Sequence, residues 1–499
     1  MTTLRLHPDD NVLVTRVALT KGDRVGGHPA LSAVPAAHKI AANPITKGRA
    51  VCKYGQVIGI AARNIAAGEH VHTHNLIYDP APLDHDFCAG YRQTEIRQTD
   101  TFMGYLRPND TVGTRNYIAV LSMVNCSASV SDRIAASFDA SELADYPNVD
   151  GVVPFVSGTG CGMSGSGEGF ETLQRVMWGY ARNPNIGGVL LVGLGCEINQ
   201  IDFLLEAYGI TPGPRFQVMN IQTIGGMAKT IAAGVARIRE MLPEVNKATR
   251  TPAPVSKLML ALQCGGSDGL SGITANPALG LASDMLVAQG ATVVLSETPE
   301  IYGAEHLLTS RAATPEVANA LLTRVQWWED YVARNLGSMD NNPSPGNKAG
   351  GLTTILEKSL GAVAKAGTTG LMAVYKYAEP ITTSGLVFMD SPGYDPASVT
   401  GQMASGCNII AFTTGRGSTF GSKPAPTIKI ASNTPMYDHM SEDMDINAGR
   451  IISHDADLAV VAQDIYDSIL SVSSGQATLS EAQGLGGHEF VPWQIGAVM

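Results

Sequence analysis

The chain has 499 residues, of which 44% are hydrophobic and 16% charged, with 54 glycines, and this composition excludes a disordered or fibrous protein. Its formal net charge of -11 argues against a nucleic-acid partner, because phosphate binding needs a basic surface, although a local basic pocket can still hold an acidic substrate. The length exceeds what one hydrophobic core usually supports, so two or three domains are expected.

The chain start and the cysteine content indicate the compartment. The segment MTTLRLHPDD lacks the apolar core of a secretion signal, and no apolar run is long enough to span a bilayer. We therefore expect a cytoplasmic protein with no membrane partner. The 7 cysteines lack the dense spacing of a disulfide scaffold, which favours reduced thiols or metal ligands.

The first part of the chain, residues 1–79, is predicted to be a small β-rich module. Short apolar runs at 11–19, 38–45, 50–61 and 69–77 are separated by glycines and small polar residues. Residues 80–100 are polar and lack a clear period, so they are predicted to form a linker.

From residue 101 onward the pattern repeats an apolar run, a glycine-rich loop and an amphipathic stretch, which predicts βα units. Such units occupy 117–138, 149–180 and 187–209, and after a proline-containing segment at 251–254 the series restarts at 257–297. Further strand-like runs lie at 386–393, 408–417 and 426–432. The prediction is an α/β fold with a central region at 101–250 and a C-terminal region at 251–499, built on open, mostly parallel sheets.

Four cysteines share one setting, at the end of an apolar run just before an expected helix: Cys126, Cys161, Cys196 and Cys264. Ligands of parallel sheets bind outside the carboxyl ends of the strands, so these loops can converge. A helix N-terminus beside a thiol stabilises the thiolate, which is the form that binds metals. Thiolates select iron, iron–sulfur clusters, zinc or copper. Burial in small core gaps is the alternative for each cysteine.

Histidines and lysines of the first module could act on an acid. In GEHVHTHN, the alternation of a strand would place His72 and His74 on one face, where they could bind a metal or serve as acid and base. A solvated edge strand is the alternative interpretation. Upstream, His38 with Lys39 and Lys53 with Tyr54 add groups that could hold a carboxylate.

Loops of the C-terminal region offer further polar groups. NNPSPGNKAGG presents Asn347 and Lys348, and TTGRGS presents Arg416 after a strand, where a guanidinium can bind a carboxylate through two hydrogen bonds. CGGSDG places Asp268 beside Cys264 in a loop whose backbone N–H groups could cradle an anion. Ordinary turn formation is the alternative for each loop. GLGCE lacks the rest of a dinucleotide fingerprint, so no nicotinamide cofactor is predicted.

Together these motifs resemble the altronate/galactarate dehydratase family. The resemblance rests on GEHVHTHN, KYGQVIG, TVGTRNY, GLGCE, QCGGSDGLSGITANP, NPSPGNKAGG, KAGTT, TTGRGS and MDINAG, which are spread over nearly the whole chain. It implies an N-terminal SAF-type β-clip module, a central dimerising domain and a Rossmann-like C-terminal domain. It also implies iron-dependent dehydration of a hexonate or hexarate to a 2-keto-3-deoxy acid. Ser157 stands where many members carry a histidine, so this chain must use another group or another substrate.

Dehydration of a 2,3-dihydroxy acid needs a base for the proton beside the carboxylate and a Lewis acid for the leaving hydroxyl. We predict that iron, as Fe²⁺ or an iron–sulfur cluster, is held by Cys126, Cys161 and Cys196. The predicted catalytic residues are His72, His74 and Lys53, and the predicted substrate-binding residues are His38, Lys39, Asn75, Asp268, Asn347, Lys348 and Arg416. The expected partners are a small sugar acid and a second copy of the chain.

Three other functions remain open at this point. A related lyase could expel another group, such as sulfite from a sulfo-acid. The fold could serve a non-catalytic sugar-acid sensor, which needs no open metal site. A zinc structural protein with a closed set of four cysteines would leave no position for a substrate.

Overall fold

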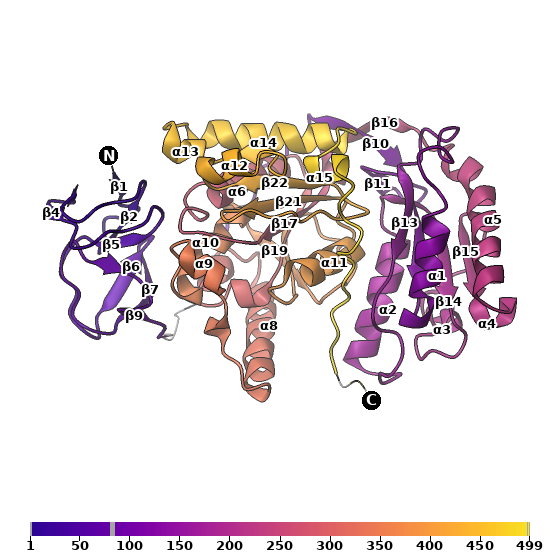
Figure 1. Cartoon of the computed structure of the whole chain (residues 1–499), viewed down its shortest axis with the longest axis horizontal. Coiled ribbons are helices and arrows are strands. Elements are labelled where there is room, and N and C mark those ends of the chain that lie inside the picture. Colours follow the sequence, from indigo (N-terminus) through magenta and orange to yellow (C-terminus); the bar gives the residue numbers. More distant parts are fainter. Residues whose placement is uncertain (1, 80–84, 497, 499) are drawn as a thin grey trace.

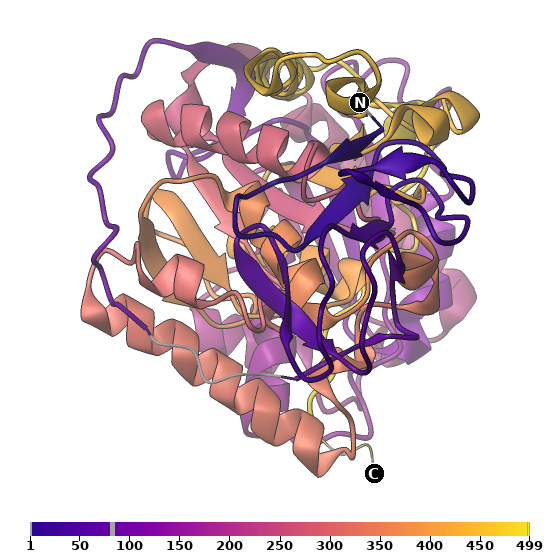
Figure 2. The same ribbon diagram turned by 90° about the vertical axis from the view of Figure 1, so that its left-hand side faces the viewer.

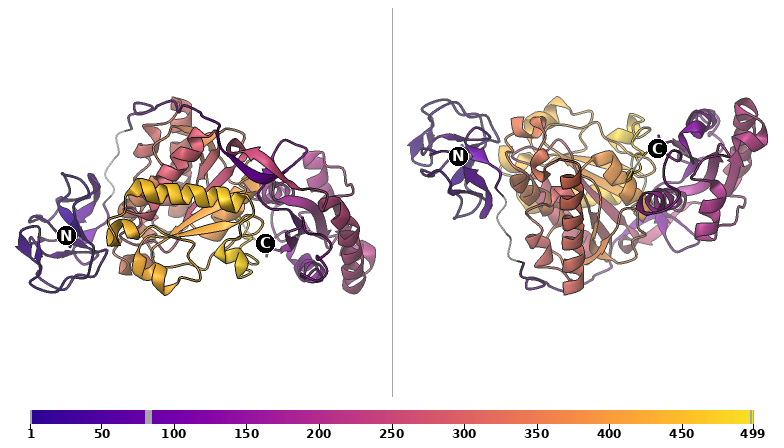
Figure 3. Two further views of the ribbon diagram at one scale, coloured as in Figure 1. Left: turned by 90° about the horizontal axis from the view of Figure 1, so that it is seen from above. Right: turned by 90° about the horizontal axis from the view of Figure 1, so that it is seen from below.

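The computed structural model describes residues 2–79, 85–496 and 498. Figure 1 shows three bodies in a row, with the C-terminal α/β domain in the middle, the N-terminal strands at one end and the central α/β domain at the other. The views from above and below give the same order (Figure 3). The expected α/β class is confirmed. None of the helices in the described part of the chain has the length and apolar character that a membrane crossing requires.

The N-terminal module consists of short antiparallel strands around a small core. One sheet has the order β1-β2-β5-β8 and another the order β6-β7-β9, with β3 and β4 paired separately. Buried Val12, Ile40, Val51, Ile58 and Val71 supply its interior. The strands are β1 (Thr3–Leu4), β2 (Val12–Thr15), β3 (Arg24–Val25), β4 (His28–Pro29), β5 (Lys39–Ala41), β6 (Ala50–Lys53), β7 (Gln56–Ala61), β8 (His70–Val71) and β9 (Leu76–Ile77).

The strand predicted across His72 and His74 is wrong. Strand β8 ends at Val71, and a turn follows, in which the side-chain oxygen of Asn75 accepts a hydrogen bond of 2.9 Å from the backbone N–H of His72. Asn75 stops the ladder because its side chain offers the backbone an alternative partner. The two histidines therefore do not share a strand face.

Part of the predicted linker, 80–84, lies outside the described residues. Residues 85–100 contain no helix or strand and follow the surface of the C-terminal domain, where Cys88 N–H donates to Thr309 O at 3.1 Å and Arg97 N–H donates to Ala288 O at 2.7 Å (Figure 2). The chain then enters β10 (Thr101–Leu106), which pairs with β11 (Val112–Gly113) and with β16 (Arg250–Pro254). The prolines of β16 are tolerated because that strand lies at the sheet edge.

The central domain is a four-stranded parallel sheet of order β13-β12-β14-β15 with helices on its faces. Strands β12 and β14 are buried along their whole length, as expected when helices cover both faces of a parallel sheet. The elements are β12 (Tyr117–Ser122), α1 (Asn125–Ala135), β13 (Gly151–Phe155), α2 (Glu168–Ala181), β14 (Ile186–Gly193), α3 (Ile201–Tyr208), β15 (Phe216–Asn220), α4 (Ile221–Ile224) and α5 (Met227–Val245).

The C-terminal domain contains a seven-stranded, all-parallel sheet of order β19-β20-β18-β17-β21-β22-β23. The strands are β17 (Met259–Cys264), β18 (Thr292–Leu295), β19 (Leu371–Tyr375), β20 (Gly385–Met389), β21 (Ile409–Thr414), β22 (Thr427–Ala431) and β23 (Ile446–Asn447). The strand order reverses between β17 and β21, so the loops after these two strands lie at the switch point where ligands of such sheets bind.

Helices surround this sheet on both faces (Figure 1). They are α6 (Ala275–Ala288), α7 (His306–Thr309), α8 (Pro315–Arg334), α9 (Pro345–Ala349), α10 (Ile355–Val363), α11 (Asp395–Ser405), α12 (Thr434–His439), α13 (Arg450–Ser453), α14 (Leu458–Ser473) and α15 (Leu479–Ala482), with single turns η1 (Val255–Lys257), η2 (Thr298–Glu300), η3 (Met339–Asn341) and η4 (Ala364–Ala366). The last residues return towards the central domain, where Phe490 packs edge-on against Phe155 and Tyr180.

Candidate active site

The loops after β17, β18 and β20 enclose a pocket of about 290 Å³ at the carboxyl edge of the seven-stranded sheet. Cys264 is the last residue of β17, Glu300 lies in the turn η2 after β18, and Asp395 begins α11 after β20. The pocket is lined by Cys264, Gly265, Gly266, Glu300, Asn341, Asn342, Ser344, Asn347, Lys358, Gly393, Tyr394 and Asp395. Titratable groups of both signs thus meet at the carboxyl edge of the sheet.

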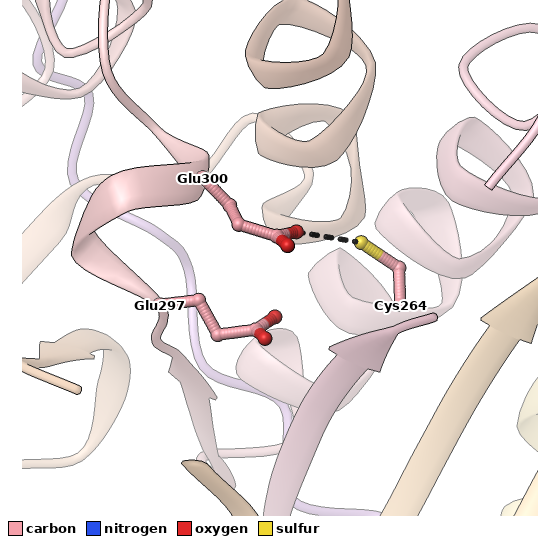
Figure 4. Close-up of side chains that lie close together, drawn as sticks. All are labelled: Cys264, Glu297 and Glu300. Carbon is pink, nitrogen blue, oxygen red and sulfur yellow. Dashed lines mark hydrogen bonds between the residues drawn. The ribbon is translucent and has the colours of Figure 1, made fainter. Parts of the chain in front are cut away.

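Cys264, Glu297 and Glu300 form a compact buried group (Figure 4), and Cys264 and Glu300 also line this pocket. One ligand atom from each lies within 4.8 Å of the others, and no other such group of three histidine, cysteine or acidic residues occurs in the described chain. The Cys264 thiol lies 3.6 Å from Glu300 Oε2. Both carboxylate oxygens of Glu297 are buried, and neither has a hydrogen-bond partner among the described residues. Such orphaned acceptors are costly and point to a ligand or to a proton.

Two buried lysines partly balance these groups. Lys358 Nζ lies 2.6 Å from Glu300 Oε1, and Lys365 Nζ lies 2.8 Å from the Cys264 sulfur and 3.9 Å from Glu297 Oε2. Burial lowers the pKa of Lys365, but Cys264, Glu297 and Glu300 raise it above its ordinary value, so the amine stays charged. Burial raises the pKa of the Cys264 thiol to about 12, so the sulfur is a thiol that accepts from the ammonium.

The carboxyl groups of the site have pKa values that are pushed apart. Burial and the neighbouring Glu300 raise the pKa of Glu297 well above its ordinary value. Burial would also raise the pKa of Glu300, but Lys358 and Lys365 lower it below the ordinary value. Burial and Glu300 raise the pKa of Asp395 to about 7. The site therefore combines an ionised carboxylate, Glu300, with a protonated one, Glu297, and with Asp395, whose pKa lies near neutrality. Acids with such different pKa values are typical of an acid–base site.

The sequence-based prediction missed Glu297, Glu300, Lys358, Lys365 and Asp395. A usable signal was present, because SETPE and SPGYDP follow the apolar runs that became β18 and β20, just as the cysteine loops follow theirs. Gly265 lets these parts approach, since a Cβ at that position would lie 2.4 Å from Asp395 Oδ2.

A larger cavity of about 900 Å³ opens beside this pocket, between the N-terminal module and the C-terminal domain. Gly266, which lines the small pocket, accepts through its carbonyl from the N–H of Arg416, which lines the larger cavity, at 2.7 Å. The Arg416 side chain is exposed in the cavity, with no hydrogen bond or ion pair to any described residue. Arg416 therefore remains available to bind a carboxylate, and its role in substrate binding stays a prediction.

Other predicted substrate-binding residues are occupied by structural contacts. Asp268 Oδ1 accepts from the backbone N–H of Ser271 and from the hydroxyls of Ser271 and Ser432, each at 2.8 Å. The Ser271 N–H is therefore bound to Asp268 and does not cradle an anion. Asn347 closes the capping box of α9 and donates to Ser267 O at 2.9 Å. Asn75 is fully buried within its own turn. These side chains shape the site and leave little free polarity for a substrate.

Lys39 and Lys53 are buried and hold the N-terminal module against α10. Lys39 Nζ lies 2.8 Å from Glu357 Oε2 and Lys53 Nζ lies 2.9 Å from Glu357 Oε1, with all three side chains at most 1% exposed. Lys39 also donates to Gly351 O at 2.7 Å. The prediction that these amines face a substrate therefore needs correction, because both are already paired across the interface.

A cluster of histidines lies next to this interface. His38 Nε2 is 3.2 Å from Ala349 O and His72 Nε2 is 2.9 Å from Lys348 O, while His38 Nδ1 is 3.0 Å from His70 Nε2. Burial lowers the pKa of His38 to about 4 and that of His70 to about 3, so both rings are neutral. Since a carbonyl only accepts, His38 Nε2 carries the hydrogen and its Nδ1 accepts from His70.

The exposed His74 and the half-buried His70 complete the cluster, with ring centroids 5.5 Å apart. In the described chain, neither His74 nor the Lys348 amine has a hydrogen bond or ion pair. These two side chains and Arg416 are the predicted site residues that remain free on this side of the molecule.

We expect the docking of the N-terminal module to weaken in acid. The pKa of His38 is about 4 in the folded state against an ordinary value of 6.5, so the neutral ring contributes stability that is fully present above pH 6.5. This contribution is lost as the pH falls towards 4, because the unfolded chain binds the proton more readily. The melting temperature should fall as the pH is lowered from 7.5 to 4.5, and it should fall less steeply in His38→Gln. An equal dependence of the melting temperature on pH in both proteins would contradict a role of His38 in docking the module.

The three predicted iron ligands lie in another part of the molecule. Cys126, Cys161 and Cys196 follow β12, β13 and β14 of the central sheet, and all three are exposed. The pocket above belongs to the C-terminal sheet, and the central domain lies on the side of that domain away from the N-terminal module (Figure 1). Cys264 is buried apart from the others. The chain thus separates the predicted thiol ligands from Arg416 and Lys348, which contradicts one shared site.

A parallel-sheet pocket next to acids with pKa values pushed apart is the arrangement found in α/β enzymes that transfer protons. The family models specify it further: "Altronate/galactarate dehydratase SAF domain" matches residues 1–79, "D-galactarate dehydratase/Altronate hydrolase, second domain" matches 104–246, and "D-galactarate/Altronate dehydratase, C-terminal" matches 255–498. The chain belongs to the galactarate/altronate dehydratase family, as its motifs suggested.

Curated relatives support this placement over nearly the whole length. The chain is 35% identical to altronate dehydratase of Bacillus subtilis strain 168, covering 95% of each chain. It is also 35% identical to galactarate dehydratase (L-threo-forming) of Escherichia coli K12, covering 97% of this chain and 95% of that one. The beta subunit of (2R)-sulfolactate sulfo-lyase from Chromohalobacter salexigens is 31% identical over 78% of this chain and 96% of its own.

Proposed function

We propose that the protein is a hydro-lyase that converts a sugar-derived 2,3-dihydroxy acid, a hexonate or hexarate, to a 2-keto-3-deoxy acid. The observation that carries the proposal is the buried acid–base group at the small pocket, above all the Glu297 carboxyl beside Cys264 and Glu300, which has no hydrogen bond to any described residue. The relatives named altronate and galactarate dehydratase support this reaction class.

In this reaction the C2–H bond is broken by a base, the C3–O bond breaks with loss of water, and the resulting enol becomes the ketone. Asp395 is the base we assign, because it lines the pocket and its pKa of about 7 suits proton removal near neutrality. The Lys358 ammonium, also in the lining, stabilises the negative charge that builds on the carboxylate as the proton leaves. Arg416, which lines the larger cavity, and the unpaired amine of Lys348 are the groups that we assign to binding a substrate carboxylate.

Iron dependence forms part of this proposal, and the buried group fits the ion. One sulfur and two carboxylates within 4.8 Å are suitable donors for Fe²⁺, and the two oxygens of Glu297 have no hydrogen bond to any described residue. Binding there would release the protons of Cys264 and Glu297 and displace the Lys365 amine from the sulfur. Bound iron would supply a Lewis acid for the leaving hydroxyl. This assignment replaces the exposed cysteines as the site of catalytic iron.

The proposal is tested by incubating the chain anaerobically with ferrous iron and a panel of hexonates, hexarates and sulfo-acids. Formation of a 2-keto-3-deoxy acid supports it. Release of sulfite without loss of water would instead favour the lyase chemistry named in the Chromohalobacter relative. No turnover of any acid, with iron bound, would favour a sensor. A homodimer is also proposed, and the mass in solution tests it.

We expect Arg416→Met to raise KM about 10- to 100-fold with little change in kcat, because a charge-assisted hydrogen bond is worth about 1.5–3 kcal/mol. The guanidinium is exposed and unpaired in the described structure, so its loss should leave the fold intact. Arg63→Met, which removes a guanidinium paired with Glu69 on the N-terminal module, is the matched control and should leave KM unchanged. A large fall in kcat with constant KM would place Arg416 outside carboxylate binding.

A further inference from the structure

The turn that carries Glu297 and Glu300 depends on support from the neighbouring strand end. Glu297 has a backbone φ of 71°, in the left-handed region that residues other than glycine rarely adopt. Such a conformation persists only where surrounding contacts hold it, and it is common at functional sites. Here Ser391 accepts through its hydroxyl from Glu297 N–H and through its carbonyl from Thr298 N–H, each at 3.0 Å. The backbone of the turn is therefore fixed to the loop after β20, the strand that pairs with β18.

Asp390 makes the side-chain contact that completes this support. Asp390 is 3% exposed, and its Oδ1 accepts from Thr298 Oγ1 at 2.6 Å and from Trp328 Nε1 at 2.8 Å. One oxygen thus joins the turn η2 to helix α8. The other oxygen, Oδ2, lies 3.9 Å from Arg324 Nη1, which partly balances the buried charge. Asp390 is not among the described residues that line the small pocket, so it acts on the turn rather than on a bound acid.

The C-terminal tail of the chain packs on Trp328, the second donor to Asp390. The Trp493 ring stacks on the Trp328 ring, with centroids 5.3 Å apart and an interplanar angle of 7°. Trp493 also meets Tyr377 edge-on, and its backbone N–H donates to Tyr377 Oη at 3.3 Å. Trp328 is only 5% exposed, so its hydrogen bond lies where water is excluded and is stronger than it would be in water. The stacked indole of Trp493 therefore secures the orientation in which Trp328 donates to Asp390.

From these contacts we propose that Asp390 is a positioning residue for the dehydration, and that Trp493 of the C-terminal tail acts with it. The inference rests on the proposed function, because the task of Asp390 is to hold Glu297 and Glu300 beside Cys264. Precise placement matters, since a shift of about 1 Å in a reacting group can lower the rate about 100-fold. If Asp390 only stabilised the packing of α8, its loss would lower stability without a specific effect on the turn.

The test compares two substitutions of Thr298 in the full chain. Thr298→Val removes the hydroxyl donor at constant size, whereas Thr298→Ser keeps it. Hydrogen exchange of the peptide 296–302, measured by mass spectrometry, reports on the turn, because Glu300 N–H donates to Glu297 O at 2.7 Å. We expect Thr298→Val to speed exchange in this peptide by about 3- to 10-fold, as for the loss of one hydrogen bond. It should also lower kcat by about 10- to 100-fold with little change in KM, and Thr298→Ser should restore both values.

Substitutions of Asp390 and Trp493 test the rest of the contact. Asp390→Ala should resemble Thr298→Val, and Asp390→Asn, which keeps the accepting Oδ1, should retain most of the rate. Trp493→Ala should speed exchange of the same peptide, whereas Trp493→Phe, which can still stack, should not. The matched control is Thr323→Val, which removes an exposed hydroxyl that donates to Asn319 O at 2.8 Å on α8 and should change neither exchange nor kcat.

Unchanged exchange of the peptide 296–302 in Thr298→Val would overturn the proposal. Faster exchange in every peptide with an unchanged kcat would overturn it as well, because Asp390 would then serve only the stability of the fold. If the wild-type chain turned over no sugar acid, the proposed function would fail. Exchange would still decide the structural claim in that case: acceleration confined to the turn would support it, and none would refute it.

Discussion

Asp395→Asn is expected to lower kcat by about 10²- to 10⁴-fold, the usual contribution of a positioned general base. Asparagine keeps the size of the side chain and cannot accept the substrate proton. The pKa of Asp395 is about 7, so the wild-type kcat/KM should rise with pH up to about 7 and then level off. The residual activity of the variant should not show this rise of kcat/KM with pH. The measurement is initial rate against pH with the acid that the screen identifies.

The matched control is Asp438→Asn, which changes an exposed carboxylate on α12. It should preserve both kcat and the shape of the profile. If Asp395→Asn kept the rise of kcat/KM near pH 7 with only a modest loss of rate, a group other than Asp395 would be the base.

Glu357→Gln is expected to cause the largest loss of stability, about 3–5 kcal/mol, because it leaves Lys39 and Lys53 buried without a counter-charge. Lys39 and Lys53 lower the pKa of Glu357 to about 2 against the burial that raises it, so the carboxylate contributes stability that is present above pH 4.5 and lost as the pH falls towards 2. Thermal melting should show an early transition of the N-terminal module in the variant.

Glu244→Gln provides the comparison, since it breaks the exposed ion pair between Glu244 at the end of α5 and Lys247 just after it, and should cost about 0–1 kcal/mol. Equal melting shifts for the two variants would mean that the buried triad contributes no more than a surface pair. Replacing all three buried residues with apolar ones of similar size should restore part of the stability, because no charge is then left unpaired.

Much of the fold was predictable because its signals are local. Buried parallel strands such as β12, β14 and β17 are continuous apolar runs followed by glycine-rich loops, and that pattern depends on neighbours in the sequence. The prediction of a strand through His72 and His74 was wrong for another local reason. The residue pattern alternates as in a strand, but the Asn75 side chain accepts a hydrogen bond from the His72 backbone and stabilises a turn instead.

The candidate site was less predictable because it depends on which sheet each loop belongs to. The four cysteine loops look alike in sequence, yet three belong to the central sheet and Cys264 belongs to the C-terminal one. Lysines such as Lys39 and Lys53 could bind a substrate carboxylate. Only their pairing with Glu357, which is distant in the sequence, shows that they hold the N-terminal module against α10. Long-range pairings of this kind leave no mark in the spacing of a single sequence.

The buried Lys39–Glu357–Lys53 triad should allow the N-terminal module to bind the rest of the protein as a separate chain. If residues 1–79 were expressed as a separate polypeptide, the interface would carry two cations on one partner and one anion on the other, each costly to bury alone. Such a surface discriminates strongly against unrelated partners while binding its own. The covalent connection then serves mainly to raise the local concentration of the module, so two co-expressed chains should assemble into the same interface at sufficient concentration.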